Sequence, residues 1–236
     1  MKEKIIVAWS GGKDSAMALH ELTNSGIFEI TALITTLTED YERISMHGVR
    51  RVLLNEQASL LRLPLEEIRI TKQGTNEEYE KKMAECLKKH KEKGVESVAF
   101  GDIFLEDLKK YRENNLAKIS MRGLFPLWGK DTLGLARSFI QAGFKSILTC
   151  VDGKKLSGEF AGRIFDEKLL SDLPSDVDPS GENGEFHSFV FDGPILSLPV
   201  RFKKGKTVLR DNRFYYCDLF PDRCLPDLRG QESLTA

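Results

Sequence analysis

Short apolar runs alternate with longer amphipathic runs over the first half of the chain, as far as about Trp128. The short runs are β-branched or aromatic and end at glycine, proline or charge, which is typical of buried strands. They cover residues 5–9, 30–36, 67–71, 97–100 and 124–127. The amphipathic runs, which place apolar residues at helical spacing, cover residues 14–25, 49–61, 76–93 and 107–121. This order predicts an α/β fold with a five-stranded parallel sheet and flanking helices.

A different pattern begins near Gly129 and Lys130 and predicts a smaller α+β domain. Its predicted helices cover residues 132–142 and 159–170, and its predicted strands cover residues 145–151, 185–191, 195–200, 208–209 and 213–219. Between them, a stretch dense in Pro, Asp, Ser and Gly predicts a loop. We therefore expect a nucleotide-binding domain over residues 1–130, a substrate-binding domain over residues 131–225 and a disordered polar tail over residues 226–236.

Composition and charge narrow the class of protein. The formal net charge of the 236 residues is −1, so no basic field favours nucleic acid as a partner. The four cysteines are too scattered for a disulfide framework, and we expect reduced thiols. No apolar run is long enough to span a bilayer, and the N-terminal residues do not form a signal peptide. A cytoplasmic enzyme without membrane contact is expected.

The sharpest feature is a Gly-Gly turn between the first predicted strand and the first predicted helix. Glycines let backbone N–H groups point into one concavity, and the helix that follows adds the positive end of its dipole. Two serine hydroxyls and a lysine supply further donors, so the loop predicts a phosphate site, although a turn without a ligand is the alternative. Two other phosphate-loop patterns, GxxxxGK[ST] and GxGxxG, are absent here. The loop residues are Ser10, Gly11, Gly12, Lys13, Asp14 and Ser15.

Four positions in or near this loop are candidates for contact with the nucleotide or its metal ion. Asp14 either caps the helix or holds Mg²⁺, which prefers hard oxygen ligands. Gly101 and Asp102 end the fourth predicted strand, at the edge of the sheet where ligands bind, although Asp102 can instead cap a following turn. His47 lies at the end of a long polar connection. It either contacts substrate or nucleotide, or it is a helix-cap or surface histidine.

The second half of the chain holds a cluster of ionisable residues at 181–188, GENGEFHS. Strand alternation places Glu185 and His187 on one face, where they can bind an amine or act as a general base. A metal site lacks a third ligand at a recognisable spacing. The alternative is an edge strand with a solvated face.

These motifs carry a resemblance to a known family. The loop SGGKDS resembles the PP-loop of ATP pyrophosphatases, in which the β and γ phosphates leave together as pyrophosphate. With the other motifs, the chain resembles the diphthine-ammonia ligase family over nearly its whole length. The motifs are MHG at 46–48, FGD at 100–102, PLWGKD at 126–131, GENGEFHS at 181–188 and DGP at 192–194.

The resemblance implies a Rossmann-like fold of the HUP class that uses ATP and Mg²⁺, with Thr35 near the adenine. From the residues themselves, we expect Lys13, Asp14, Glu185 and His187 to act in catalysis, with Asp14 as the magnesium ligand. The expectation for Glu185 and His187 rests on their clustering alone. A carboxyl adenylate would form on the diphthine side chain of translation elongation factor 2, and ammonia would displace AMP to give diphthamide. The partners are then ammonia and, in an archaeal or eukaryotic source, diphthine-bearing elongation factor 2. A homodimer is among the assemblies that we expect.

Two alternatives remain open at this level. One is a PP-loop enzyme for tRNA modification or small-molecule amidation. The absence of a CxxC pair and of a basic field argues against tRNA modification. The other is a nucleotide-binding module without catalysis. The fold permits such a module, but the presence of Lys13 and Asp14 argues against it.

Overall fold

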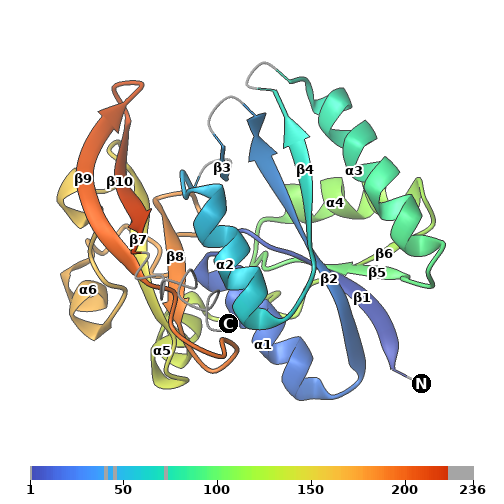
Figure 1. The fold of residues 1–236 in the computed structure, drawn as a ribbon. Helices are drawn as coiled ribbons and strands as arrows, with labels where there is room; N and C mark the ends of the chain where they lie inside the picture. Colours follow the sequence, from blue (N-terminus) through green and yellow to red (C-terminus); the bar gives the residue numbers. More distant parts are fainter. Residues whose placement is uncertain (1, 40–41, 45–46, 72–73, 223–236) are drawn as a thin grey trace, which may run out of the picture.

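The computed structural model describes residues 2–222 except for residues 40–41, 45–46 and 72–73. Its first sheet contains β1 (Glu3–Ala8), β2 (Phe28–Thr38), β3 (Arg43–Ile44), β4 (Leu65–Ile70), β5 (Ser97–Ala99) and β6 (Arg122–Leu124). The strand order is β3-β2-β1-β5-β6, and β4 pairs with the second half of β2. All pairs are parallel except that between β2 and the two-residue strand β3. The predicted five-stranded parallel sheet is confirmed, with β3 as a short addition (Figure 1).

Four helices cover the two faces of this sheet. They are α1 (Lys13–Ser25), α2 (Arg51–Leu61), α3 (Asn76–Lys91) and α4 (Glu106–Ala117). Residues of α1 and α2 share one apolar core with one face of the sheet, while α3 and α4 build a second core against the other face. The sheet is therefore covered on both sides, which explains why Ile5, Ile6 and Val7 of the central strand β1 are all fully buried.

A second sheet is antiparallel and has the strand order β8-β7-β10-β9. Its strands are β7 (Lys145–Asp152), β8 (Phe186–Asp192), β9 (Phe202–Arg210) and β10 (Phe214–Pro221), accompanied by α5 (Thr132–Gln141), the 3₁₀ turn η2 (Gly158–Phe160) and α6 (Glu167–Asp172). The prediction of a smaller α+β unit after the parallel sheet is confirmed.

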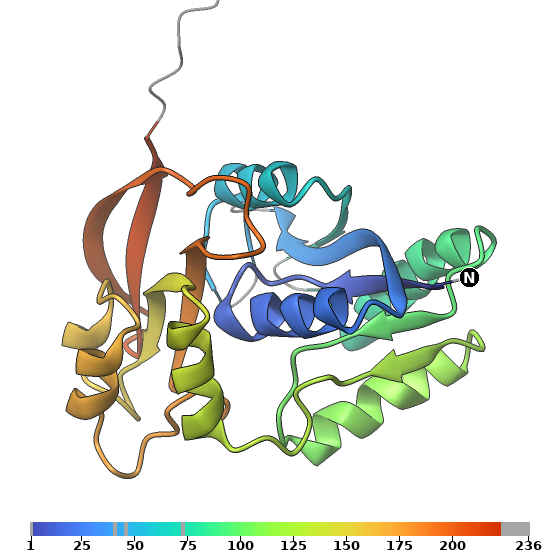
Figure 2. The same ribbon diagram turned by 90° about the horizontal axis from the view of Figure 1, so that it is seen from below.

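The helix α1 lies between the two sheets (Figures 1 and 2). Ala16, Met17, Ala18 and Leu19 are four consecutive buried residues, so neighbours cover the helix on more than one face. One hydrophobic core accordingly runs from β1 through α1 and α2 to the second sheet. The two units are packed together as one body around α1, and this places β8 beside the loop that precedes the helix.

Three predicted elements differ from the structure. The helix expected over residues 159–170 is interrupted by Gly162, whose φ is +82°, and α6 begins only after the N-cap Asp166. The strand expected over residues 195–200 is absent because this segment, which lies after Pro194 and contains Pro199, forms turns. The fifth parallel strand lies at Arg122–Leu124 rather than at residues 124–127.

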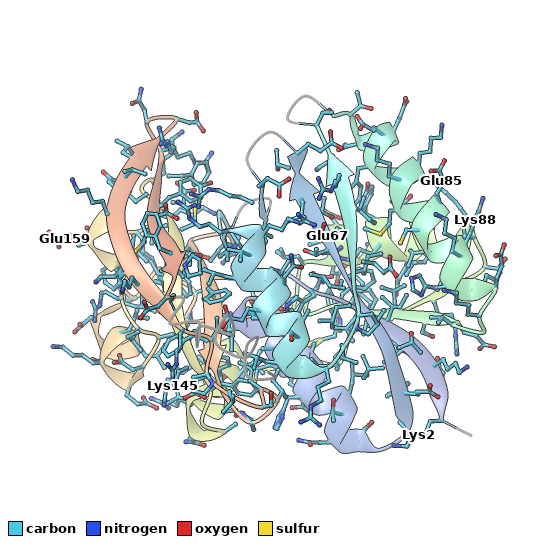
Figure 3. The ribbon with its side chains drawn as sticks, viewed as in Figure 1. Lys2, Glu67, Glu85, Lys88, Lys145 and Glu159 are labelled. Carbon is cyan, nitrogen blue, oxygen red and sulfur yellow. The ribbon has the colours of Figure 1, made fainter. Side chains whose placement is uncertain are left out.

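Charged side chains lie around the outside of this body. Figure 3 shows Lys88, Lys145 and Glu159 pointing away from the protein on different elements. None of the helices in the described ranges is long and apolar enough to cross a membrane.

Candidate active site

A cleft of about 580 Å³ opens at the carboxyl ends of β1, β2 and β5 and is closed on one side by β8. This is the edge of an open α/β sheet where ligands bind. Ten of the twelve residues predicted from the sequence line it: Ser10, Gly12, Lys13, Asp14, Ser15, Thr35, His47, Gly101, Asp102 and His187. The tertiary structure thus brings the predicted residues of both halves to one cavity, while Gly11 and Glu185 lie behind its wall.

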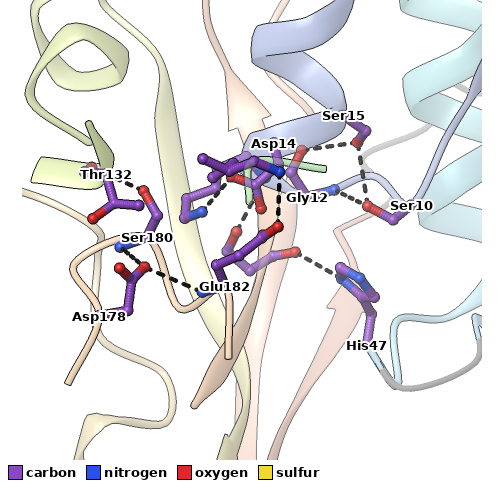
Figure 4. Close-up of polar contacts among 12 residues, drawn as sticks. Ser10, Gly12, Asp14, Ser15, His47, Thr132, Asp178, Ser180 and Glu182 are labelled. Carbon is purple, nitrogen blue, oxygen red and sulfur yellow. Dashed lines mark hydrogen bonds and ion pairs between the residues drawn. The ribbon is translucent and has the colours of Figure 1, made fainter. Parts of the chain in front are cut away.

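The phosphate-loop geometry is present at the start of α1. The helix begins at Lys13 after the N-cap Gly12, which offers no capping side chain. The positive end of the helix dipole therefore faces the cleft, as an anion site requires. Ser10 and Ser15 place their hydroxyl oxygens 3.2 Å apart beside this turn (Figure 4). Asp14 lies in the first turn of α1, so the alternative that it caps the helix is wrong.

Gly11 shapes the loop from behind. Its φ of +75° favours glycine, and a Cβ added there would lie 2.6 Å from Oε1 of Gln57. The Gly11 carbonyl accepts hydrogen bonds from Nε2 of Gln57 at 3.0 Å and from the Val190 N–H at 2.9 Å. The Gly11 carbonyl thus fixes the loop against α2 and β8.

Lys13 and Asp14 form an ion pair inside the cleft. The Lys13 side chain is only 5% exposed, whereas the Asp14 side chain is 34% exposed. Burial raises the pKa of Asp14, and the Lys13 charge opposes that rise. An anionic ligand can take the place of the Asp14 carboxylate beside the ammonium group.

Glu182 faces Asp14 from the other half of the chain (Figure 4). Its Oε1 accepts a hydrogen bond from the Ile103 N–H at 2.7 Å. Burial, together with the charges of Asp14 and Asp102, raises the pKa of Glu182 to about 7. Glu182 was not among the predicted site residues, although it stands in the same GENGEFHS motif.

Glu185 does not face the cleft. It is 3% exposed, and its Oε1 accepts hydrogen bonds from the Asp178 N–H and from Nδ2 of Asn183, both at 3.2 Å. The predicted pairing of Glu185 with His187 is wrong in geometry, because Glu185 precedes β8 and turns into the loop. Its carboxylate holds the loop that carries Glu182.

His187 instead stands beside His47, which comes from the connection between β3 and α2. The ring centroids are 4.6 Å apart with an interplanar angle of 36°. Nδ1 of His47 donates to the Ser188 carbonyl at 3.2 Å. Burial lowers the pKa of His47 to about 4 and that of His187 to about 3, so both rings are neutral at pH 7. The cleft therefore contains two neutral imidazoles near Lys13.

Asp102 is held by Arg112 of α4. The guanidinium Nε and Nη2 donate to the carboxylate at 2.6 and 3.2 Å, and the guanidinium carbon lies 4.3 Å from the ring centroid of Phe100. The N-cap of α4 is Leu105, so Asp102 does not cap that helix. This bidentate pairing fixes Asp102 at the cleft wall and brings Arg112, which the sequence did not single out, into the site.

Comparison with known protein families gives two matches. The model of the diphthamide synthase N-terminal domain matches residues 3–122, and that of the diphthamide synthase C-terminal domain matches residues 131–218. A search of curated proteins gives no significant match.

One similar solved structure is described as the predicted subunit of tRNA methyltransferase from Methanocaldococcus jannaschii DSM. It is 20% identical, and the alignment covers 66% of this chain and 80% of that one with a TM-score of 0.39. A likeness at this level carries no functional argument.

Proposed function

The chain belongs to the diphthamide synthase family, and from this premise we propose that it is an ATP-dependent, AMP-forming ligase that joins ammonia to diphthine. The products would be diphthamide, AMP and pyrophosphate. The observation that supports this is the contact between the SGGKDS loop and the GENGEFHS segment, where the Lys13 N–H donates to Oγ of Ser188 at 3.1 Å. A nucleotide on the loop would thereby lie beside the residues of the second unit.

In the first step, a diphthine carboxylate oxygen attacks the α-phosphorus of ATP, and the bond to the β-phosphate oxygen breaks. Pyrophosphate leaves with the bonding electrons. The start of α1 and the Lys13 ammonium group would stabilise the negative charge of the departing pyrophosphate. Lys13 suits this role because it is already held in the cleft beside Asp14.

The cleft also offers oxygen ligands that fit magnesium. Asp14 and Glu182 bring two carboxylates close enough for the Asp14 charge to raise the pKa of Glu182. A divalent cation between them would relieve that repulsion, and carboxylate oxygens are the ligands that Mg²⁺ prefers. We therefore propose Asp14 as the magnesium ligand, with Glu182 beside it. When bound, the ion supplies positive charge to the phosphate oxygens.

In the second step, ammonia attacks the carbonyl carbon of the acyl-adenylate and the bond to AMP breaks. The nitrogen gives up one proton to complete the amide. We assign His187 as the acceptor because its neutral imidazole lines the cleft, whereas the Glu185 carboxylate does not reach it.

The direct test uses ATP labelled at the α-phosphate, Mg²⁺ and ammonium, with and without diphthine-bearing elongation factor 2. We expect labelled AMP only with the factor. Lys13→Ala should lower the rate about 100-fold, on the scale of losing one transition-state charge contact. The control is Lys145→Ala, which changes an exposed lysine outside the cleft and should leave the rate unchanged. AMP formed without the factor would refute the substrate, labelled ADP would refute the mechanism, and ATP binding without any turnover would indicate a binding module.

A second test separates the two steps. His187→Asn should retain the exchange of labelled pyrophosphate into ATP in the presence of the factor but lose most amide formation. If both activities fall together, His187 does not act in the ammonia step.

A further inference from the structure

Three side chains of kinds that bind metals lie close together on α3 and β4, away from the cleft. We propose that Glu66, Cys86 and His90 form a binding site for Zn²⁺. One ligand atom from each lies within 4.8 Å of the others. None of the three lines the cleft, so the site is independent of the proposed function.

The backbone places the three ligands together without distortion. Cys86 and His90 are four residues apart on α3, which puts them on one face of the helix. Glu66 belongs to β4, the strand that contacts α3. A metal at this point would join a helix to the sheet beneath it.

One separation already matches a zinc site. Nε2 of His90 and Oε1 of Glu66 are 3.4 Å apart. Two ligands at about 2.0–2.1 Å from a tetrahedral zinc ion are about 3.3–3.4 Å apart. The Cys86 sulfur can supply the third vertex, because it lies within 4.8 Å of one ligand atom of each of the other two side chains.

The surroundings shield the site on the His90 side and open it on the Glu66 side. His90 is 8% exposed, and its Nε2 lies 3.4 Å from Oε1 of Glu66. A zinc ion between these two atoms would be shared by both side chains. The Glu66 side chain is 44% exposed, which gives an ion a path from solvent.

The ligand set selects the type of metal. A thiolate, an imidazole and a carboxylate suit zinc, whereas magnesium and calcium prefer oxygen ligands alone. Three protein ligands leave a fourth position for water. Tyr79 and Met83 of the same helix line the cleft, so a metal that fixes α3 to β4 would also steady that wall.

The test is a calorimetric titration of the full-length, metal-stripped protein with Zn²⁺. We expect one ion per chain outside the cleft, with binding weakened at least tenfold in Cys86→Ser, His90→Asn and Glu66→Gln. The matched control is Glu85→Gln, an exposed carboxylate on the same helix that should leave the affinity unchanged (Figure 3). Absence of binding, or equal affinity in all variants, would overturn the proposal.

Co²⁺ gives a second readout that does not depend on variant folding. Bound to the wild-type protein, it should show a sulfur-to-cobalt charge-transfer band and the visible spectrum of a four-coordinate ion. A spectrum without the charge-transfer band would exclude Cys86 as a ligand and refute the site.

Discussion

Gln57 is a fully buried amide where the phosphate loop, α2 and β8 meet. It accepts a hydrogen bond from Nε1 of Trp9 at 3.0 Å and donates to the carbonyls of Gly11 and Val190 at 3.0 and 2.6 Å. A side-chain amide can accept a hydrogen bond through its oxygen and donate two through its nitrogen without carrying a charge. One residue therefore fixes the loop to both units.

Replacing Gln57 with leucine should lower the free energy of unfolding by about 2–4 kcal/mol. The reason is that each buried donor or acceptor left without a hydrogen-bond partner costs about 1–3 kcal/mol. Urea denaturation measures the change. Gln141→Leu, at an exposed position at the end of α5, is the control. An equal, small effect in both variants would contradict the role of Gln57.

The two neighbouring histidines of the cleft should make the stability of the protein depend on pH. His47 and His187 have folded-state pKa values lowered by burial to about 4 and about 3, against about 6.5 in an unfolded chain. The unfolded state therefore binds more protons below pH 6.5. The stability from the neutral rings is fully present above that pH and falls as the pH drops towards the folded values.

His187→Asn should reduce the slope of unfolding free energy against pH between pH 6 and pH 4.5 by up to about 1.4 kcal/mol per pH unit, which is the effect of one proton. Urea denaturation at several pH values provides the measurement. The control is His20→Asn, which changes a half-buried histidine of α1 that lies outside the cleft and contacts Asn24. The explanation fails if the slope of His187→Asn equals that of the wild type.

At the scale of elements, the carboxyl end of β5 packs against the start of α1. A Cβ added to Gly101 would lie 2.8 Å from the Asp14 carbonyl carbon and 3.0 Å from the Ser15 nitrogen. These are backbone atoms, which cannot turn aside as a side chain can. Glycine is thus needed where the strand end meets the loop that we propose to hold phosphate.

Gly101→Ala should displace the first turn of α1 and weaken ATP binding at least tenfold, about 1.4 kcal/mol. Calorimetry with Mg²⁺ and ATP tests this. The control is Gly134→Ala in α5, where the added carbon meets only the Asp131 side chain. Unchanged ATP affinity in Gly101→Ala would show that the close approach does not shape the site.

At the scale of the whole molecule, polar pairs join the two units across α2. Asp218 of β10 accepts hydrogen bonds from Arg43 and Arg50 at 2.7–3.2 Å. Burial acts to raise the pKa of Asp218, but the bonds and charges of the two arginines outweigh it, so the pKa is lowered. The ion pairs complement the shared apolar core.

Asp218→Asn should lower the free energy of unfolding by about 1–3 kcal/mol, because two partly buried guanidinium groups lose their charge partner. Asp172→Asn removes an ion pair with Arg163 within the second unit and should cost about 0–1 kcal/mol, as exposed pairs do. Urea denaturation of both variants at pH 7 compares them. Equal losses would indicate that Asp218 does not strengthen the junction.

The fold was predictable wherever neighbouring residues decide the structure. Strands β1, β2 and β5 were predicted because each contains a short contiguous apolar run, and α1 because of its spacing after the Gly-Gly turn. The bounds of β6 were missed because Arg122–Leu124 is not an apolar run. The helix expected over residues 159–170 failed because Gly162 interrupts it, and the two-residue strand β3 exists only through its pairing with β2. The two residues of β3 do not by themselves indicate which strand they pair with.

The candidate site, like the fold, was predictable where neighbouring residues decide the structure and not elsewhere. The residues of SGGKDS are adjacent in the chain, so the sequence by itself determined the phosphate loop and pointed to the family. The tertiary structure alone decided that Glu182 faces Asp14, that Glu185 turns into its loop, and that Gln57 and Arg112 belong to the site. The approach of Glu182 to Asp14 and the hydrogen bond of Gln57 to Val190 join segments far apart in the sequence, and they depend on how the second unit packs against the first, which no local pattern encodes.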